Sequence, residues 1–384
     1  MADPSLPRVA VALWTLVPGR IGGSETYVRG LLGALALRPD AAQITVLAGR
    51  AARPAVAAQL ATRAVRAPMP AGRPARAAAL MAGLAAGRAL GRGAPAHEVL
   101  HVPLTVPAPR TGAPVVLTLH DVHHHDLPLT FARAERIFRR WAYDEPARRA
   151  AVVITPSEHT RERAVVRLGL DPARVVAIHH GLDHDRLRPD PDPADGRVLA
   201  NVPPLPGRFA LYPAMLLPHK AHETLLRALA RTEDRELGLV LTGHRDPARW
   251  ATLRALAGSL GIDHRVHHLG RVPEHALGPL MRRATVLAFP SRYEGFGLPV
   301  IEAMACGLPV VAARATAVPE VTGDAALLVE PGDEPALAAA LDRLASDGTD
   351  AGRLREAGLR RAMAFTWDGC GEGHADAYRM AREA

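Results

Sequence analysis

Two glutamates, Glu294 and Glu302, are separated by seven residues in the stretch SRYEGFGLPVIEAMACGLPVV, residues 291–311. An apolar run precedes this stretch, so the pattern predicts a strand, a glycine-rich turn and then a helix. Pro299 suits the first helical turn, where its missing N–H costs nothing, and Gly307 suits the helix end. The amides at the start of such a helix attract an anion such as phosphate.

The two carboxylates are unsuited to contact that phosphate themselves, because like charges repel. We expect Glu294, just before the turn, and Glu302, one helical turn further on, to flank the anion and to accept hydrogen bonds from hydroxyl groups. A nucleotide sugar offers both kinds of group, since its diphosphate lies between sugar and ribose hydroxyls. The alternative is a glycine turn whose glutamates only favour a helix N-terminus.

Lys220 is the only lysine among the 47 basic residues of the chain. Its ammonium is a compact charge on a flexible stem, whereas arginine carries a planar fork. The exception therefore suggests that position 220 requires an ammonium, and chance is the alternative explanation.

The elements that would position these residues alternate along the chain. Short β-branched runs alternate with stretches rich in Ala, Leu and Arg, which is typical of parallel sheets covered by helices on both faces. The predicted strands are 8–14, 43–49, 98–103, 114–120, 151–157 and 174–181 in the first half, and 208–215, 237–243, 265–270, 284–290 and 308–313 in the second.

The length of 384 residues favours two domains. We expect a Rossmann-like domain over 1–188, a proline-rich linker over 189–207 and a second Rossmann-like domain over 208–366. A last helix at about 367–384 is expected to pack back on the first domain. Ligands bind beyond the carboxyl ends of strands in such sheets, so two domains facing each other would enclose a cleft.

Composition narrows the class of protein. Two cysteines, Cys306 and Cys370, provide neither a disulfide framework nor a paired-cysteine zinc pattern. The start of the chain, MADPSLPR, does not resemble a signal peptide, and no apolar run is long enough to span a membrane. We therefore expect a soluble cytoplasmic protein.

The net charge of +8 is uneven along the chain, because residues 1–190 hold 25 arginines and 15 acidic residues. This basic half could face nucleic acid, an anionic membrane or an anionic substrate, or could reflect composition alone. Aromatic residues make up only 4% of the chain, so we do not expect nucleic-acid binding. The segment 72–93 predicts one helix that lies either on a membrane or on a sheet.

The histidines of HDVHHHD, residues 120–126, could suggest a metal site. A single loop cluster without a partner motif is weak evidence, so we expect no metal and side chains that are solvated or face an acceptor. The chain also lacks a Walker loop, a GxGxxG fingerprint and a Gly-x-Ser-x-Gly elbow.

The stretch EGFGLPVIEAMACGLPVV is very similar to the donor-site signature of retaining GT-B glycosyltransferases of family 4. The resemblance extends over nearly the whole chain and implies a GT-B fold, with two Rossmann-like domains whose parallel sheets face a central cleft. The other matching stretches are GRIGGSETYVRGLLGAL (19–35), VITPSEHTRERAVVRLGLDPARVVAIHHGLD (153–183), LYPAMLLPHKAHETLLRAL (211–229), LVLTGH (239–244) and VHHLGRVPEHALGPLMRRATVLAFPS (266–291).

The resemblance implies a role for each matching residue. Glu294 would contact the transferred sugar, and Glu302 would hold the ribose. Lys220 would neutralise the diphosphate, and His120 would lie beside the sugar. The other donor-binding positions that it implies are Gly22, Gly23, Gly243, Arg271, Val272, Phe296, Gly297 and Leu298.

This chain departs from the family pattern at two positions. Relatives often carry Arg five residues before the lysine, where this chain has Met215, or directly before it, where this chain has His219. We expect His219 to take over as a second phosphate donor.

The resemblance implies the retaining transfer of a hexose from a nucleoside-diphosphate sugar to an acceptor hydroxyl, without cofactor or metal. The acceptor would be a glycan, a glycolipid or a cell-envelope polysaccharide intermediate, met at the inner face of the membrane. The residues PHKAH, 218–222, resemble those of bacterial mannosyl- or rhamnosyl-type polysaccharide enzymes, and this resemblance favours GDP-mannose as the donor. The alternatives are a non-catalytic nucleotide-sugar-binding homologue and a nucleotide-sugar epimerase.

Overall fold

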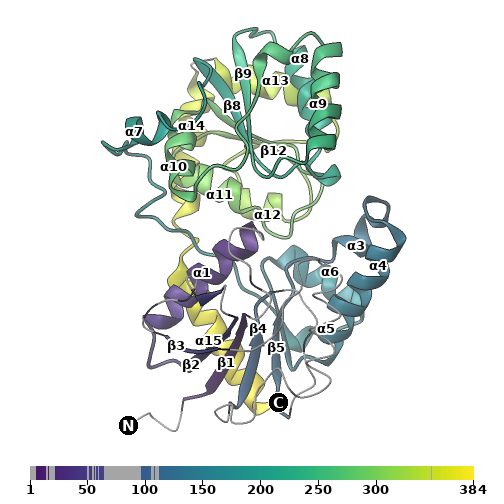
Figure 1. The fold of residues 1–384 in the computed structure, drawn as a ribbon, viewed down its shortest axis with the longest axis vertical. Coiled ribbons are helices and arrows are strands. Elements are labelled where there is room, and N and C mark those ends of the chain that lie inside the picture. The colour runs from purple at the N-terminus through teal and green to yellow at the C-terminus, as the bar shows by residue number, and fades with distance from the viewer. Residues whose placement is uncertain are drawn as a thin grey trace. The chain divides into compact units, whose positions relative to one another are not determined.

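The computed structural model describes residues 6–13, 16, 22–49, 52–53, 56, 58, 60–64, 97–104, 108, 112–346 and 348–384. The chain forms two compact units, which we call unit 1 (Met1–Gly181 with Thr366–Ala384) and unit 2 (Leu182–Phe365) (Figure 1). Each unit holds one parallel sheet with helices, so the predicted fold class of two Rossmann-like domains is confirmed.

The sheet of unit 1 has the order β3-β2-β1-β4-β5-β6-β7 and is parallel throughout. Its central strands are almost entirely buried, as expected for apolar runs covered on both faces. The strands are β1 (Arg8–Leu13), β2 (Gln43–Ala48), β3 (Ala61–Ala64), β4 (Val99–Val102), β5 (Val115–Thr118), β6 (Val152–Thr155) and β7 (Val175–Ala177).

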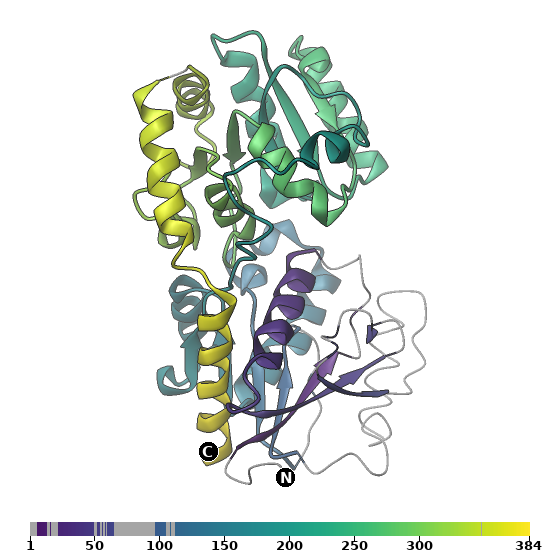
Figure 2. The same ribbon diagram turned by 90° about the vertical axis from the view of Figure 1, so that its left-hand side faces the viewer.

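The helices of unit 1 include the C-terminal α15, which lies beside α1 in this unit (Figure 2). The indole of Trp367 occupies the space that a Cβ at Gly30 would need, so these helices approach closely. The helices are α1 (Gly23–Ala36), α3 (His123–Asp126), α4 (Arg133–Arg139), the π-helix η3 (Arg140–Asp144), α5 (Glu145–Arg149), α6 (Glu158–Leu168) and α15 (Trp367–Glu383).

The sheet of unit 2 has the order β10-β9-β8-β11-β12-β13 and is also parallel. Its strands are β8 (Arg208–Pro213), β9 (Leu237–Thr242), β10 (Val266–His268), β11 (Val286–Phe289), β12 (Val310–Ala313) and β13 (Leu327–Val329). Its helices are α7 (Asp195–Leu199), α8 (His222–Arg231), α9 (Pro247–Ser259), α10 (Glu274–Arg283), α11 (Leu298–Ala305), α12 (Val318–Thr322), α13 (Glu334–Ala345) and α14 (Thr349–Ala362).

The chain passes between the units at residues 181/182 and 365/366, so the proline-rich segment 189–207 belongs to unit 2. This differs from the expected linker. Helix α7 forms inside the segment, and its Asp195 accepts two hydrogen bonds from Arg282 of α10, at 2.7 and 2.6 Å. This bidentate ion pair fixes the segment to unit 2 despite its prolines.

Two strands were not predicted from the sequence patterns. β3 and β13 are the end strands of their sheets and are only four and three residues long. The predicted helix 72–93 lies outside the described residues. Within the part of the chain that the structure describes, no helix has both the length and the apolar character needed to cross a membrane.

Candidate functional site

Lys220 and Glu294 form an ion pair in unit 2, with 2.5 Å between Nζ and Oε1. Lys220 ends the short 3₁₀ turn that follows β8, and Glu294 lies in the loop that follows β11. These strands are hydrogen-bonded neighbours, so parallel pairing brings two residues 74 positions apart to the same sheet edge. Their side chains are only 16% and 12% exposed.

The backbone around Lys220 is tied to the core. The hydroxyl of Tyr212, at the end of β8, donates to the Lys220 carbonyl at 2.9 Å. The next residue, Ala221, has a left-handed φ of 52°, a conformation that is unfavourable for residues with a side chain. This conformation turns the backbone into α8. The His219 carbonyl accepts the amide N–H of Arg292 at 2.8 Å, so the loops after β8 and β11 are also joined to each other.

Thr316 supports the Glu294 loop from the turn after β12. Its Oγ1 accepts the amide N–H of Glu294 at 2.9 Å, and its φ is 50°. A β-branched residue rarely takes this conformation, and such strain persists where the surroundings fix it. No sequence motif singled out Thr316. The only signal was its position three residues after β12, because β12 pairs with β11 and the loop after β11 contains Glu294.

The glycine turn begins α11 as predicted from its sequence. Gly297 is the residue before the helix and has φ 108°, a conformation that favours glycine. Phe296 and Leu298 are buried in the core of unit 2, and the Phe296 ring meets Phe365 edge-on at 5.7 Å between centroids. Their side chains are therefore committed to packing, and only their backbone groups could serve a ligand.

Glu302 lies within α11 and is 7% exposed. Burial raises its pKa to about 7, while the positive charge of Arg186 opposes this and the negative charge of Glu274 adds to it. At neutral pH the carboxyl group is thus partly protonated, so it can donate as well as accept a hydrogen bond.

The remaining predicted residues of unit 2 lie at neighbouring strand ends. Gly243 follows β9 directly and donates its N–H to the carbonyl of Gly270 at 2.9 Å. Its φ is 125°, and an added Cβ would approach the Ala214 carbonyl oxygen to 2.8 Å, so no side chain fits. Arg271 is exposed after Gly270, and Val272 is half-buried against the core.

Gly22, Gly23 and His120 lie in unit 1. Gly22 precedes α1 with φ 61°, and Gly23 begins the helix. His120 follows β5 and donates from Nε2 to the Pro103 carbonyl at 2.9 Å, so its proton resides on that nitrogen. Burial lowers the His120 pKa, opposed by this hydrogen bond, and keeps the imidazole neutral.

A buried chain of hydrogen bonds lies beside His120, whose ring meets that of Tyr27 edge-on at 5.1 Å. Its bonds are 2.7–3.0 Å long. The last group is a carbonyl, which can only accept a hydrogen bond. If each group donates to the next one toward that carbonyl, every hydrogen bond in the chain has a donor and an acceptor. The chain runs from the Tyr378 hydroxyl to His101, Thr118, Tyr27, His374 and the carbonyl of Cys370. It begins and ends in α15, and no sequence motif indicated it.

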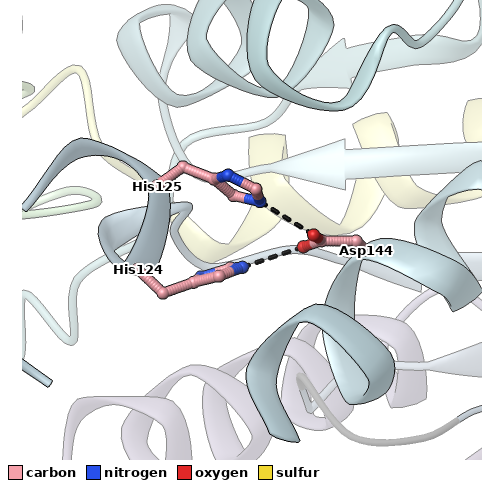
Figure 3. A group of neighbouring side chains, drawn as sticks. All are labelled: His124, His125 and Asp144. Atoms are coloured by element: carbon pink, nitrogen blue, oxygen red, sulfur yellow. Dashed lines mark hydrogen bonds and ion pairs between the residues drawn. The ribbon is translucent and has the colours of Figure 1, made fainter. Parts of the chain in front are cut away.

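The histidine cluster is represented by His124, His125 and Asp144 (Figure 3), whose ligand atoms all lie within 4.8 Å of one another. Each imidazole Nε2 donates to one carboxylate oxygen at 2.8 Å. Burial raises the pKa of Asp144, but the hydrogen bonds and charges of the two histidines together lower it by more. The two hydrogen bonds to Asp144 join the segment around α3 to the π-helix, while the buried Nδ1 of His124 has no hydrogen-bond partner within the described residues.

Two family models match the chain. The model described as Glycosyltransferase Family 4 matches residues 21–186, and the one described as Glycosyl transferases group 1 matches residues 200–361. The chain belongs to the GT-B glycosyltransferases of group 1 and family 4.

This glycosyltransferase has relatives of named activity. It is 30% identical over 273 residues to O-antigen chain mannosyltransferase B of Escherichia coli, and the aligned region covers 69% of this chain and 70% of the relative. It is 32% identical over 241 residues to D-inositol 3-phosphate glycosyltransferase of Streptomyces bingchenggensis, which covers 60% of this chain and 52% of the relative. The glycosyltransferase thus spans about half the length of that second relative.

Solved structures share the fold of the glycosyltransferase. Sucrose-phosphate synthase from Thermosynechococcus elongatus gives a TM-score of 0.78 at 23% identity, over 97% of this chain and 98% of the other. Anabaena HepE in complex with UDP-glucose gives 0.71 at 19% identity, over 96% and 98%. At these identities the likeness establishes the fold, and the GT-B class follows from it.

Proposed function

We propose that this glycosyltransferase transfers a hexose from a nucleoside-diphosphate sugar to an acceptor hydroxyl, with retention of anomeric configuration. The Lys220–Glu294 ion pair carries the proposal. The two side chains neutralise each other. A donor diphosphate would draw the ammonium toward itself and leave the Glu294 carboxylate to accept hydrogen bonds from the sugar hydroxyls.

The reaction needs stabilisation of a leaving group that gains negative charge. Lys220, His219 and the amides that begin α11 would supply it from unit 2. Groups that are already oriented stabilise the transition state without reorganising, and this preorganisation is a large source of catalysis.

Retention would follow from attack on the same face of the sugar. The bond from the anomeric carbon to the diphosphate oxygen breaks, and the acceptor oxygen bonds to that carbon. The acceptor proton passes to the leaving phosphate oxygen. We disfavour Glu294 as a nucleophile, because its carboxylate would be accepting hydrogen bonds from the sugar hydroxyls. His120, neutral and fixed through Nε2 to Pro103, would orient the sugar rather than act as the base.

We further propose that the donor is GDP-mannose and that neither metal nor cofactor takes part. The PHKAH residues and the mannosyltransferase relative support mannose. Gly243, Arg271 and Val272 would border the nucleotide, and Glu302 would hold the ribose. The acceptor would be a glycan or a lipid-linked envelope intermediate on the cytoplasmic face of the membrane.

The test is thermal unfolding of the purified protein with GDP, UDP, ADP and dTDP and their common sugars, without added metal. A ligand that binds only the folded state raises the unfolding temperature. We expect the largest rise with GDP and GDP-mannose, followed by transfer to added acceptors. Binding without transfer to any acceptor would favour the non-catalytic homologue, and a changed sugar without acceptor would favour the epimerase.

A further inference from the structure

Helix α4 and the π-helix that follows it carry an apolar stripe that faces solvent. Ala134, Ile137, Phe138 and Trp141 recur at spacings of three, four and seven, which in most proteins marks the face that packs on the core. Here no residue of α4 is buried. Ile137 is 61% exposed, Phe138 38% and Trp141 42%, and the rings of Phe138 and Trp141 lie 6.0 Å apart.

The protein holds this segment from the opposite side. The Arg139 guanidinium lies over the Phe131 ring at 4.3 Å, and Ala142 and Asp144 of the π-helix are buried. Asp144 is the residue that His124 and His125 clamp (Figure 3). The exposed stripe is therefore a fixed surface of unit 1.

Arginines flank the stripe. Arg133 precedes Ile137 by one helical turn and Arg140 adjoins Trp141, and both are exposed. Within the described ranges neither of them forms an ion pair. Glu135, the one acidic residue between them, is paired with Arg139 instead. The surface thus combines aromatic and aliphatic side chains with two positive charges that have no ion-pair partner among the described residues.

We propose that the stripe of α4 and η3 docks on an anionic phospholipid bilayer. Ile137, Phe138 and Trp141 would enter the headgroup region, and Arg133 and Arg140 would contact lipid phosphates. A specific protein interface covers about 800 Å² on each partner, which two helical turns do not offer, whereas a bilayer accepts isolated side chains. This surface differs from the segment 72–93 and is independent of the transfer chemistry.

The test is flotation with vesicles of phosphatidylglycerol and phosphatidylethanolamine, against vesicles of phosphatidylcholine alone, without any sugar donor. We expect binding to the anionic vesicles that weakens as salt rises. Ile137→Ser/Phe138→Ser/Trp141→Ser should abolish it. Arg133→Glu/Arg140→Glu should weaken it well over 20-fold, since each arginine contributes about fivefold. The controls are Leu37→Ser/Val166→Ser/Met363→Ser, whose apolar side chains are more exposed than those of the stripe, and Arg197→Glu/Arg254→Glu, which alters two exposed arginines elsewhere. Both should bind like the parent protein.

A second measurement locates the contact. Brominated acyl chains should quench tryptophan fluorescence in the parent protein, and Trp141→Phe, measured at a vesicle concentration that binds all of the protein, should lose this quenching. Failure to bind anionic vesicles at low salt overturns the proposal, and so does binding that the stripe variants leave unchanged. Self-association that Ile137→Ser abolishes, without vesicle binding, would assign the stripe to a second copy of this chain instead. Circular dichroism checks that every variant is folded.

Discussion

Removing one partner of the Lys220–Glu294 pair leaves the other as a poorly hydrated charge, because both side chains are mostly buried. Lys220→Ala and Glu294→Ala should each lower kcat about 100-fold or more while the fold persists. The double variant Lys220→Met/Glu294→Gln, which retains neither charge, should unfold at a higher temperature than either single variant. Steady-state kinetics and thermal unfolding measure this, with Arg254→Ala as the surface control. Full activity in either single variant would contradict the proposed donor site.

Glu302 should make unfolding depend on pH. Its pKa of about 7 in the folded protein exceeds its ordinary value of 4.5, so folding favours the protonated form. Between those values the unfolded chain holds fewer protons than the folded one, and the free energy of unfolding therefore falls as pH rises toward 7. The loss should be on the order of 3 kcal/mol and should level off above pH 7.

Glu302→Gln should remove this fall. Chemical unfolding at several values between pH 5 and 8 measures it, with the exposed Glu372→Gln as the matched control. Parallel pH curves for the parent protein and Glu302→Gln would show that Glu302 ionises at its ordinary pKa.

At the scale of elements, the turn after β12 should control the loop after β11. Thr316→Val keeps the β-branched shape but removes the hydroxyl that accepts the Glu294 amide. Losing one such hydrogen bond should lower kcat/KM roughly tenfold. Thr316→Ser retains the acceptor and should remain close to the parent enzyme. A structural role alone would lower stability in both variants and leave kcat/KM of the folded fraction unchanged.

Sequence patterns predicted the elements that carry this site, but they did not predict the contacts between loops. The runs that became β8, β9, β11 and β12 are apolar because both faces of a central strand are covered. β13 is half-exposed at an edge and gave no such signal. Thr316 was missed because its role depends on which strands are neighbours, and local pattern does not encode that order.

Local sequence patterns also could not predict the buried chain of hydrogen bonds that runs from Tyr378 to Cys370. Its members come from α1, β4, β5 and α15, so only the packing of the C-terminal helix reveals them. The HDVHHHD stretch, in contrast, was interpreted from its residues as a cluster without a metal, and that remains a prediction. The structure adds that His124 and His125 share Asp144, which lies 19 residues beyond the nearer histidine.

At the scale of the whole molecule, each unit has its own core and should respond to its own mutations. Tyr27→Phe leaves the Nε2 of His374 without its donor inside unit 1, which should cost about 1–3 kcal/mol. Calorimetry should show an earlier transition for unit 1, while nucleotide binding to unit 2 persists. Tyr212→Phe, which removes the hydrogen bond to Lys220 in unit 2, is the matched control and should weaken nucleotide binding instead. Equal losses of nucleotide binding in both variants would contradict this independence.

Unit 1 is assembled from two stretches of chain, one that precedes unit 2 in the sequence and one that follows it. Tyr378, Ala377 and Ala381 of α15 belong to the same core as the strands near the N-terminus. On the ribosome, strands β1 to β7 therefore lack these contacts until residues 366–384 have been made. Residues 182–365, in contrast, already contain the described strands β8 to β13 of their sheet. Unit 2 should thus mature before unit 1, and the exposed strands of unit 1 are the part that most needs chaperone protection in the interval.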